Sequence, residues 1–298
     1  MKTMFRRTAA LAGAALLAAG CASFDAWQRE KIFQNDKSAL WGQQEPPAGT
    51  QQYDLPLANG DHVHAWYLPA GAAAPTVLYL HGARRNLNGS VNRIERLHAL
   101  GFNVLAVDYR GFGRSTPLLP SEATVLEDAR AAFAELQRRQ PDPARRFVYG
   151  YSLGGAMAIA LGAEVDGLAG VIVESSFTSI PDIVRDSRWG WVPLAGTVVT
   201  QRFDSLARVR HLDEPLLLIH GTADGVVPHT MSDRLLAAAT AAPIKQLVKI
   251  DGATHRSAPT VGGAEFDRAL RDFALAASEV GAARRGAALP AAAAAAAP

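Results

Sequence analysis

The sequence predicts an α/β fold with a mostly parallel β-sheet of about eight strands and helices on both faces. Short apolar runs such as Thr76–Leu80, Asn103–Val107 and Leu216–Ile219 alternate with helical patterns. Strands that are apolar throughout belong to sheets covered on both faces. Polar, glycine-containing segments follow several of these runs directly. In parallel sheets, functional groups collect at the carboxyl ends of the strands, so a site is expected at that edge.

The length and charge favour one large domain without a nucleic-acid partner. The chain has 298 residues, of which 49% are hydrophobic, and the repeating strand and helix pattern suits a single core. Lys2, Arg6 and Arg7 belong to an expected leader, and without them 27 basic and 28 acidic side chains remain. A charge so close to zero gives no reason to expect nucleic acid.

Residues 1–20 predict a lipoprotein signal peptide. Three basic residues precede an apolar run over residues 8–20, which is too short to span a bilayer. Cys21, the only cysteine, follows small residues and resembles the lipobox cysteine of bacterial lipoproteins, although Ala18 stands where a large apolar residue is usual. The resemblance implies lipidation at Cys21 and, because Ala22 follows, anchoring in the cell envelope at the outer membrane, facing the periplasm. An ordinary secretory leader that leaves a free thiol is the alternative.

Two flanking segments are predicted around a domain over residues 51–279. Residues 21–50 are expected to be a tether and linker, and their apolar side chains recur every three to four positions, as in a short amphipathic helix that lies on the domain or on the membrane. Ordinary packing on the domain is favoured. Residues 280–298, rich in Ala and Pro, are expected to form a disordered tail, because a short alanine run is marginal as an isolated helix.

The first two strands are predicted as a hairpin. Residues 53–57 and 62–68 alternate in hydrophobicity around Asn59-Gly60, a strong turn signal. His62 and His64 share one face, but no third ligand is evident nearby, so a metal site is not expected.

The other expected elements are strands over residues 147–149, 170–173 and 246–250 and helices over residues 90–100, 122–140, 155–163, 230–239 and 264–277.

The sequence around Ser152 predicts a strand that turns sharply into a helix. The apolar run Phe147–Tyr149 precedes Ser152, and an alanine-rich helical pattern follows Gly155. Gly150 and Gly154 stand two residues before and after Ser152, where side chains would collide at such a turn. The serine would then lie above the unpaired N–H groups of a helix N-terminus, which favour negative charge. The alternative is a glycine-rich turn with an idle serine.

Five motifs resemble those of the α/β-hydrolase superfamily. They read HGARRN, DYRGFGRS, GYSLGG, HGTADGVVP and GATH, and they cover roughly residues 52–277. The set is similar in particular to a compact branch of membrane-associated serine hydrolases and serine-aminopeptidase-like proteins. The order serine, acid, histidine is the one that this fold uses. The resemblance implies a short lid over residues 177–212.

The candidate catalytic residues are Ser152, Asp224 and His255. A hydroxyl is a weak nucleophile and needs a general base, for which His255, in a loop after the last strand, is the candidate. Asp224 stands at the family position of the acid that orients the imidazole, and Glu174, at the end of another strand, is the runner-up. The resemblance implies that the backbone N–H groups of Ala83 and Leu153 bind the oxyanion.

Several residues near these motifs have a functional and a plainer interpretation. His81 and His220 lie at strand ends beside a glycine and are expected to brace loops. Arg84 and Arg85 follow the expected oxyanion residue and could meet an anionic substrate or headgroup, but a solvated loop pair is favoured. The lid aromatics Trp189, Trp191 and Phe203 could line an acyl pocket or form the lid's own core, and the sequence does not decide between the two.

The predicted function is a lipid-anchored serine hydrolase that cleaves carboxylic esters or thioesters of small-molecule or lipid-like acyl substrates. A peptidase or amidase with the same three residues is an alternative, as is a non-catalytic lipoprotein that uses the fold as a binding scaffold. No cofactor is expected, because the segment Gly111–Gly113 lacks the third glycine of a dinucleotide-binding fingerprint.

Overall fold

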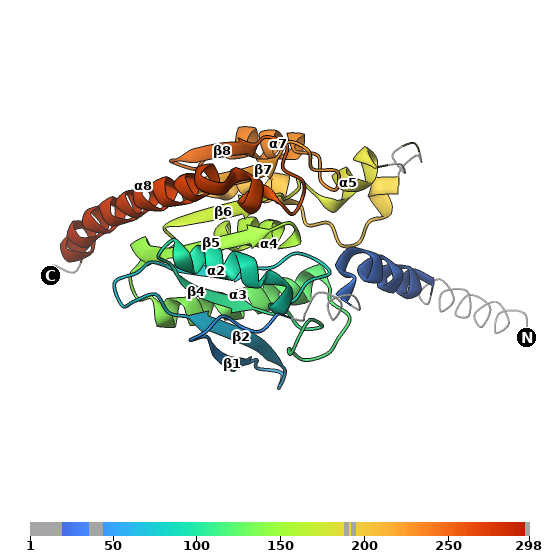
Figure 1. Cartoon of the computed structure of the whole chain (residues 1–298), viewed down its shortest axis with the longest axis horizontal. Coiled ribbons are helices and arrows are strands. Elements are labelled where there is room, and N and C mark those ends of the chain that lie inside the picture. Colours follow the sequence, from blue (N-terminus) through green and yellow to red (C-terminus); the bar gives the residue numbers. More distant parts are fainter. Residues whose placement is uncertain (1–19, 36–43, 188–190, 192–194, 296–298) are drawn as a thin grey trace, which may run out of the picture.

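One eight-stranded sheet organises the chain (Figure 1). The computed structural model describes residues 20–35, 44–187, 191 and 195–295. The strand order is β1-β2-β4-β3-β5-β6-β7-β8, in which β1 and β2, and β2 and β4, pair antiparallel and the other five pairs are parallel. The predicted fold class is therefore confirmed. The strands are β1 Gln51–Pro56, β2 His62–Leu68, β3 Thr76–Leu80, β4 Asn103–Val107, β5 Arg146–Tyr151, β6 Gly170–Glu174, β7 Leu216–Gly221 and β8 Lys245–Ile250.

Helices cover both faces of the sheet and divide the core into two layers. Helices α2 and α8 lie on one face, and α3 and α4 lie on the other (Figure 1). Alternate residues of β3 serve the two layers: Val77 and Tyr79 pack in the layer of α2 and α8, and Leu78 and Leu80 pack in the layer of α3 and α4. The helices are α2 Val91–Ala99, α3 Glu122–Arg139, α4 Leu153–Gly162, α5 Ile180–Asp186, α6 Ser205–Arg208, α7 Thr230–Ala238 and α8 Ala258–Ala295, with short 3-10 turns η2 Asn88–Ser90, η3 Pro143–Arg145, η4 Ala195–Val198 and η5 Val209–His211.

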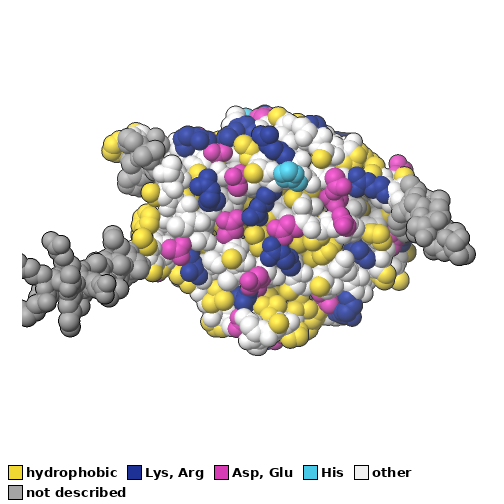
Figure 2. Space-filling model, turned by 180° about the vertical axis from the view of Figure 1, so that it is seen from behind, with side chains coloured by type: hydrophobic (Ala, Val, Ile, Leu, Met, Phe, Trp, Pro, Cys, Tyr) yellow, Lys and Arg dark blue, Asp and Glu magenta, His cyan; other side chains and the backbone are white. Residues whose placement is uncertain are grey.

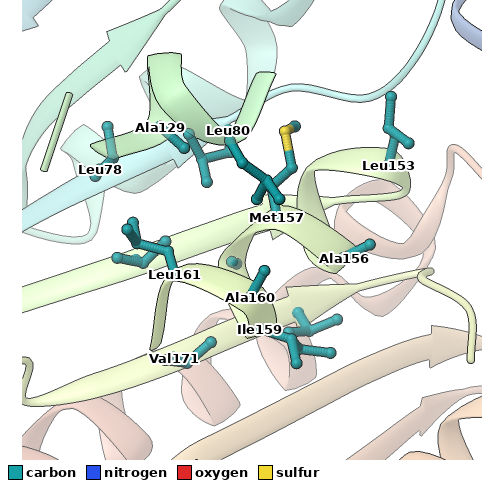
Figure 3. Packing of buried hydrophobic residues seen from close by; sticks show 14 of the residues in the cluster. Leu78, Leu80, Ala129, Leu153, Ala156, Met157, Ile159, Ala160, Leu161 and Val171 are labelled. Atoms are coloured by element: carbon teal, nitrogen blue, oxygen red, sulfur yellow. The ribbon is translucent and has the colours of Figure 1, made fainter. Parts of the chain in front are cut away.

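Helix α4 is buried along its whole length, which explains its small residues. Figure 3 shows its apolar side chains together with Leu78 and Leu80 of β3, Val171 of β6 and Ala129 of α3. Two glycines allow the close approach. A Cβ at Gly155 would lie 2.6 Å from the Cβ of Ser176, and a Cβ at Gly162 would lie 2.7 Å from Leu212. The serine that precedes this helix is therefore mounted on a closely packed part of the core.

The N-terminal segment packs on the domain. Residues 20–33 are helical, and Phe33 is fully buried, with its ring 6.0 Å from that of Phe203 in an edge-to-face contact. Gln28 donates to the carbonyl oxygen of Val198 at 2.9 Å and accepts from the amide of Thr200 at 3.0 Å. This helix is therefore held against η4 and the segment that follows it, in agreement with ordinary packing on the domain.

The C-terminus differs from the expectation. Helix α8 continues to Ala295, so residues 280–295, expected to be disordered, are helical (Figure 1). Alanine has the highest helix propensity, and the alanine-rich stretch extends a helix that already exists, so no new nucleus is needed. The expectation of disorder compared this stretch with an isolated helix, whereas it continues an existing one. Non-helical angles at Gly263 mark a kink near the start of α8.

Charges of both signs are interspersed on the surface. Seen from the side opposite to Figure 1, Lys and Arg alternate with Asp and Glu over the face shown in Figure 2. Ion pairs such as Arg130–Glu164, at 2.8 Å, are typical of such a surface. Pairs of this exposure each contribute about 0–1 kcal/mol to stability, so the fold depends mainly on its two core layers.

Candidate active site

Ser152 lies at the turn between β5 and α4 in a strained backbone conformation. Its φ is +54° and its ψ is −116°, a region that L-residues rarely adopt. A Cβ at Gly150 would lie 2.1 Å from the carbonyl oxygen of Gly154, and a Cβ at Gly154 would lie 2.0 Å from that of Leu80. The two glycines flanking Ser152 are therefore required by the close approach of backbone, as the sequence predicted.

The structure brings Ser152, His255 and Asp224 together from three separate loops. The Nε2 atom of His255 is 3.0 Å from the Oγ atom of Ser152. The Nδ1 atom of the same ring is 2.7 Å from the Oδ2 atom of Asp224. Because the carboxylate can only accept, Nδ1 carries the proton and Nε2 is left to accept from the serine hydroxyl. This is the tautomer that a general base requires.

Asp224 is held as an anion by several donors. Burial of its carboxyl opposes ionisation, but hydrogen bonds from His220, from His255 and from the amide of Val227 outweigh burial and lower the pKa of Asp224 below its usual range. The amides of Val226 and Val227 donate to its Oδ1 atom at 2.8 and 2.9 Å. Asp224 therefore stays a fixed negative charge beside the imidazole.

His220 also contacts Asp224, a contact that the sequence analysis did not predict. Its Nε2 atom is 3.1 Å from both Oδ2 of Asp224 and the carbonyl oxygen of Val227. Both partners accept, so Nε2 carries the proton, and Nδ1 accepts from the Ser232 hydroxyl at 2.6 Å. His220 braces a loop, as expected, and the loop it braces is the one that carries Asp224. Its position four residues before Asp224 was the available signal.

The runner-up acid, Glu174, is engaged elsewhere. Its carboxylate receives two hydrogen bonds from the buried Arg93, at 2.7 and 2.8 Å, and one from the hydroxyl of Tyr149. Arg93 also lies over the ring of Tyr151, 3.9 Å from its centre, and donates to the carbonyl oxygen of Arg256 at 3.2 Å. The buried pair thus supports the loop that carries His255, and the acid beside that histidine is Asp224.

A cavity of about 520 Å³ opens beside Ser152. Ala83 and Leu153, the two residues expected to supply oxyanion donors, line it together with Ser152 and His255. Leu153 is the first residue of α4, so its amide belongs to the first turn, where N–H groups lack partners within a helix. The N-terminal helix also reaches this cavity through Lys31 and Ile32, and Gln34, just after the helix, lines it as well, a contribution that no sequence motif indicated.

The aromatic residues of the expected lid do not share one role. Phe203 is buried in the core against Phe33 and does not line the cavity. Trp191 is 78% exposed, and Trp189 lies outside the described residues. Phe177, just after β6, is the aromatic residue of this region that lines the cavity. Further apolar lining from the described part of the lid comes from α5.

The histidine pair of β2 and the single cysteine lie away from the cavity. His64 contacts Asp54 at 2.7 Å, and His62 contacts the carbonyl oxygen of Arg114 at 3.0 Å, so both rings bind protein groups. The described residues contain no cluster of three or more His, Cys, Asp or Glu suited to a metal ion. Cys21 is exposed near the start of the N-terminal helix, and the expected signal peptide lies outside the described residues except for Gly20. Among the described helices, none is long and apolar enough to cross a membrane.

Comparisons with known proteins agree with this fold. Residues 71–206 match the family described as serine aminopeptidase, S33. An uncharacterized protein of Mycobacterium tuberculosis is 34% identical over 230 residues, which cover 76% of this chain and 79% of that protein. The Pyrococcus furiosus esterase Pf2001 has a similar fold, with a TM-score of 0.62 and 23% identity over 75% of this chain and 91% of that chain.

An alpha-beta hydrolase from Vibrio vulnificus is also similar in fold, with a TM-score of 0.67 and 18% identity over 82% of this chain and 91% of that chain. The family and the fold together support a serine hydrolase-type function. With the sheet order, the glycine-flanked serine and these similarities in view, the chain belongs to the α/β-hydrolase superfamily, in the family described as serine aminopeptidase, S33.

Proposed function

We propose that this protein is a serine hydrolase that cleaves carboxylic ester or thioester bonds through an acyl-enzyme. The observation that carries the proposal is the hydrogen-bonded chain from the Ser152 hydroxyl through the His255 imidazole to the Asp224 carboxylate. Beside it, a cavity with apolar lining is large enough for a small acyl group.

The reaction follows from this arrangement. The Oγ atom of Ser152 attacks the carbonyl carbon while Nε2 of His255 takes the hydroxyl proton, and Asp224 stabilises the imidazolium that forms. The amides of Ala83 and Leu153 bind the oxyanion, and each such donor contributes about 3 kcal/mol to stabilising the transition state. The imidazolium then protonates the leaving alcohol or thiol. Water, deprotonated by His255, attacks the acyl-enzyme and releases the acid.

Two other functions are compatible with the same family. A peptidase or amidase would use the same three residues, and comparing turnover of an acyl ester with that of an aminoacyl amide separates the two activities. A non-catalytic scaffold is disfavoured because Ser152, His255 and Asp224 are all present and all hydrogen-bonded. A scaffold would have no need of the strained backbone at Ser152.

We also propose that the enzyme is anchored to the bacterial cell envelope by lipid on Cys21, at the outer membrane and facing the periplasm. Support comes from the apolar leader that ends in small residues before this cysteine, and from Ala22 after it. Cys21 is exposed, so its thiol is accessible to modification. Two or three acyl chains hold a protein firmly on a membrane surface.

The test of the hydrolase proposal uses Ser152→Ala. The substitution removes the attacking oxygen, so hydrolysis of short p-nitrophenyl esters and labelling by a fluorophosphonate probe are both expected to disappear. Ser187→Ala, at an exposed serine outside the cavity, is the matched control and keeps both signals. Labelling that persists in Ser152→Ala would refute the assignment of the nucleophile.

A further inference from the structure

The cavity beside Ser152 has a substantial apolar lining. Phe177 and the α5 residues Ile180, Ile183 and Val184 contribute to it, and Val226 adds to it from the loop that carries Asp224. None of these side chains carries a charge, so this part of the cavity suits a hydrocarbon chain. The apolar lining alone would favour neutral acyl esters.

Cationic side chains form another part of the same lining. They are Lys31 from the N-terminal helix, Arg84 and Arg85 after β3, and Arg256 directly after His255. No aspartate or glutamate is among the described residues that line this cavity. The four cations come from three segments that are far apart in the sequence and meet only in the fold.

Lys31 and Arg84 are exposed, and neither side chain makes an ion pair within the described part of the chain. Arg84 has a φ of +65°, and its amide donates to a carbonyl oxygen of the N-terminal helix at 3.0 Å, which fixes its backbone. Burial is the main cause that lowers the pKa of Arg85, and the positive charges of Arg93 and Arg256 act in the same direction although Tyr151 opposes them, so positive groups repel one another here.

We propose that Lys31, Arg84, Arg85 and Arg256 bind an anionic group of the substrate. The preferred substrate is then an ester that carries both an apolar acyl chain and a negatively charged group, carboxylate or phosphate, near the reacting carbonyl. This inference rests on the proposed hydrolase function and specifies its substrate class. Arginine and lysine are the side chains that recognise such anions, and an apolar chain with an anionic group matches the two parts of the lining.

The experiment compares two pairs of similar esters, in each of which one member is an anion and the other is neutral. One pair is 4-(butanoyloxy)benzoate and its neutral methyl ester, with the charge in the leaving half. The other is mono-p-nitrophenyl glutarate and p-nitrophenyl pentanoate, with the charge in the acyl half. For at least one pair we expect kcat/KM to be about tenfold higher for the anion, mainly through KM, because several partly exposed cations act together. The preference should shrink in about 1 M salt, where the screening length falls to about 3 Å.

Substitution of the cations tests whether they cause the preference for anionic esters. Lys31→Gln combined with Arg84→Gln should lower the anion-to-neutral ratio several-fold. Arg210→Gln, at an exposed arginine of η5 outside the cavity, should leave the ratio at the wild-type value. A ratio near one for both pairs in the wild type, or the same ratio in the double variant and in Arg210→Gln, would overturn the proposal.

Failure of the hydrolase function and failure of the substrate class give different results. If wild-type protein cleaves none of the four esters, the hydrolase proposal itself fails, and the substrate class fails with it. If both members of each pair are cleaved equally and vesicles with an anionic phospholipid slow them equally, the cations belong to a membrane-binding surface and the substrate proposal is wrong. Hydrolysis that depends on Ser152 and shows the charge preference without vesicles supports it.

Discussion

At the scale of single residues, the two candidate acids differ in what surrounds them. Glu174 is the last residue of β6 and Asp224 follows β7, and both carboxylates are buried. Asp224 contacts the imidazole of His255 at 2.7 Å, whereas Glu174 neutralises Arg93. The sequence alone could not separate their roles, because Arg93 lies on α2 and meets Glu174 only in the folded chain. Removing the charge of Asp224 should therefore mainly reduce activity, and removing the charge of Glu174 should mainly reduce stability.

Asp224→Asn is expected to reduce kcat/KM by about 10³- to 10⁴-fold with little change in Tm, because the amide no longer favours the tautomer that leaves Nε2 of His255 free to accept. Glu174→Gln leaves the buried Arg93 without its counter-charge and should cost about 3 kcal/mol or more of unfolding free energy. Ester kinetics and thermal unfolding of both variants provide the comparison. A full loss of activity in Glu174→Gln with an unchanged Tm would reverse the assignment of the acid.

At the scale of elements, the N-terminal helix is part of the site. Phe33 inserts into the core, its carbonyl oxygen accepts from the amide of Arg84, and the neighbouring Lys31 and Ile32 line the cavity. The three-to-four spacing of its apolar residues predicted a helix that packs somewhere, but a periodic pattern does not identify the surface that it covers. The contact with Phe203, far away in the sequence, could not be predicted from it.

Phe33→Ala tests this role. Removing a fully buried ring should lower the free energy of unfolding by about 3–5 kcal/mol and reduce kcat/KM by at least about tenfold, because the loop of Ala83 and Arg84 loses its support. Phe24→Ala, in the same helix but at a side chain that is 43% exposed, should cost below about 1 kcal/mol. Urea unfolding and ester kinetics measure both effects. Equal losses of stability and activity in the two variants would mean that Phe33 has no special role in holding the helix on the domain.

Helix α3 is joined to the first strand through Glu135, which makes stability depend on pH. Burial raises the pKa of Glu135, but hydrogen bonds from Arg138, Arg139 and Tyr53 outweigh burial and bring the pKa from 4.5 to about 2. Because the folded pKa lies below the unfolded one, the ionised carboxylate stabilises the fold above pH 4.5. This contribution is lost as the pH falls from about 4.5 to about 2.

Glu135→Gln should therefore lower the free energy of unfolding at about pH 6, and the difference from the wild type should narrow at about pH 3. Denaturant unfolding at the two pH values measures this. Glu95→Gln, at an exposed glutamate of α2 that makes no ion pair within the described residues, is the matched control and should show no such trend. A difference that widens on acidification would contradict the assigned direction of the pKa shift.

At the scale of the whole molecule, most of the sheet and the central residues of the site could be predicted because each motif directly follows an apolar run. Parallel strands bring their carboxyl ends to one edge, so Ser152, Asp224 and His255 were expected to meet there. What could not be predicted depends on contacts between distant segments. Arg84 and Arg85 were expected to form a solvated pair, and only the fold places Lys31 and Arg256 in the same cavity.

The N-terminal helix connects the proposed lipidation site, Cys21, to the cavity. Within the described residues, Cys21 lies on this helix ten positions before Lys31, which lines the cavity, a distance of about 15 Å along the helix axis at 1.5 Å per residue. Since Gln28 and Phe33 hold this helix on the domain, lipid on Cys21 would keep the cavity at a set distance from the membrane surface. A flexible tether would leave that distance free.

Lipidation itself is tested by growing cells with an alkyne-labelled fatty acid. Wild-type protein should incorporate the label, Cys21→Ser should not, and Ser23→Ala, two residues further along the same helix, should incorporate it as the wild type does. Because Cys21 is exposed and does not line the cavity, purified Cys21→Ser should hydrolyse a soluble ester at the wild-type kcat/KM. If the mass spectrum of the mature wild-type protein shows a free thiol on Cys21, the proposed lipid anchor is wrong. The N-terminal helix would then not set the distance between the cavity and a membrane.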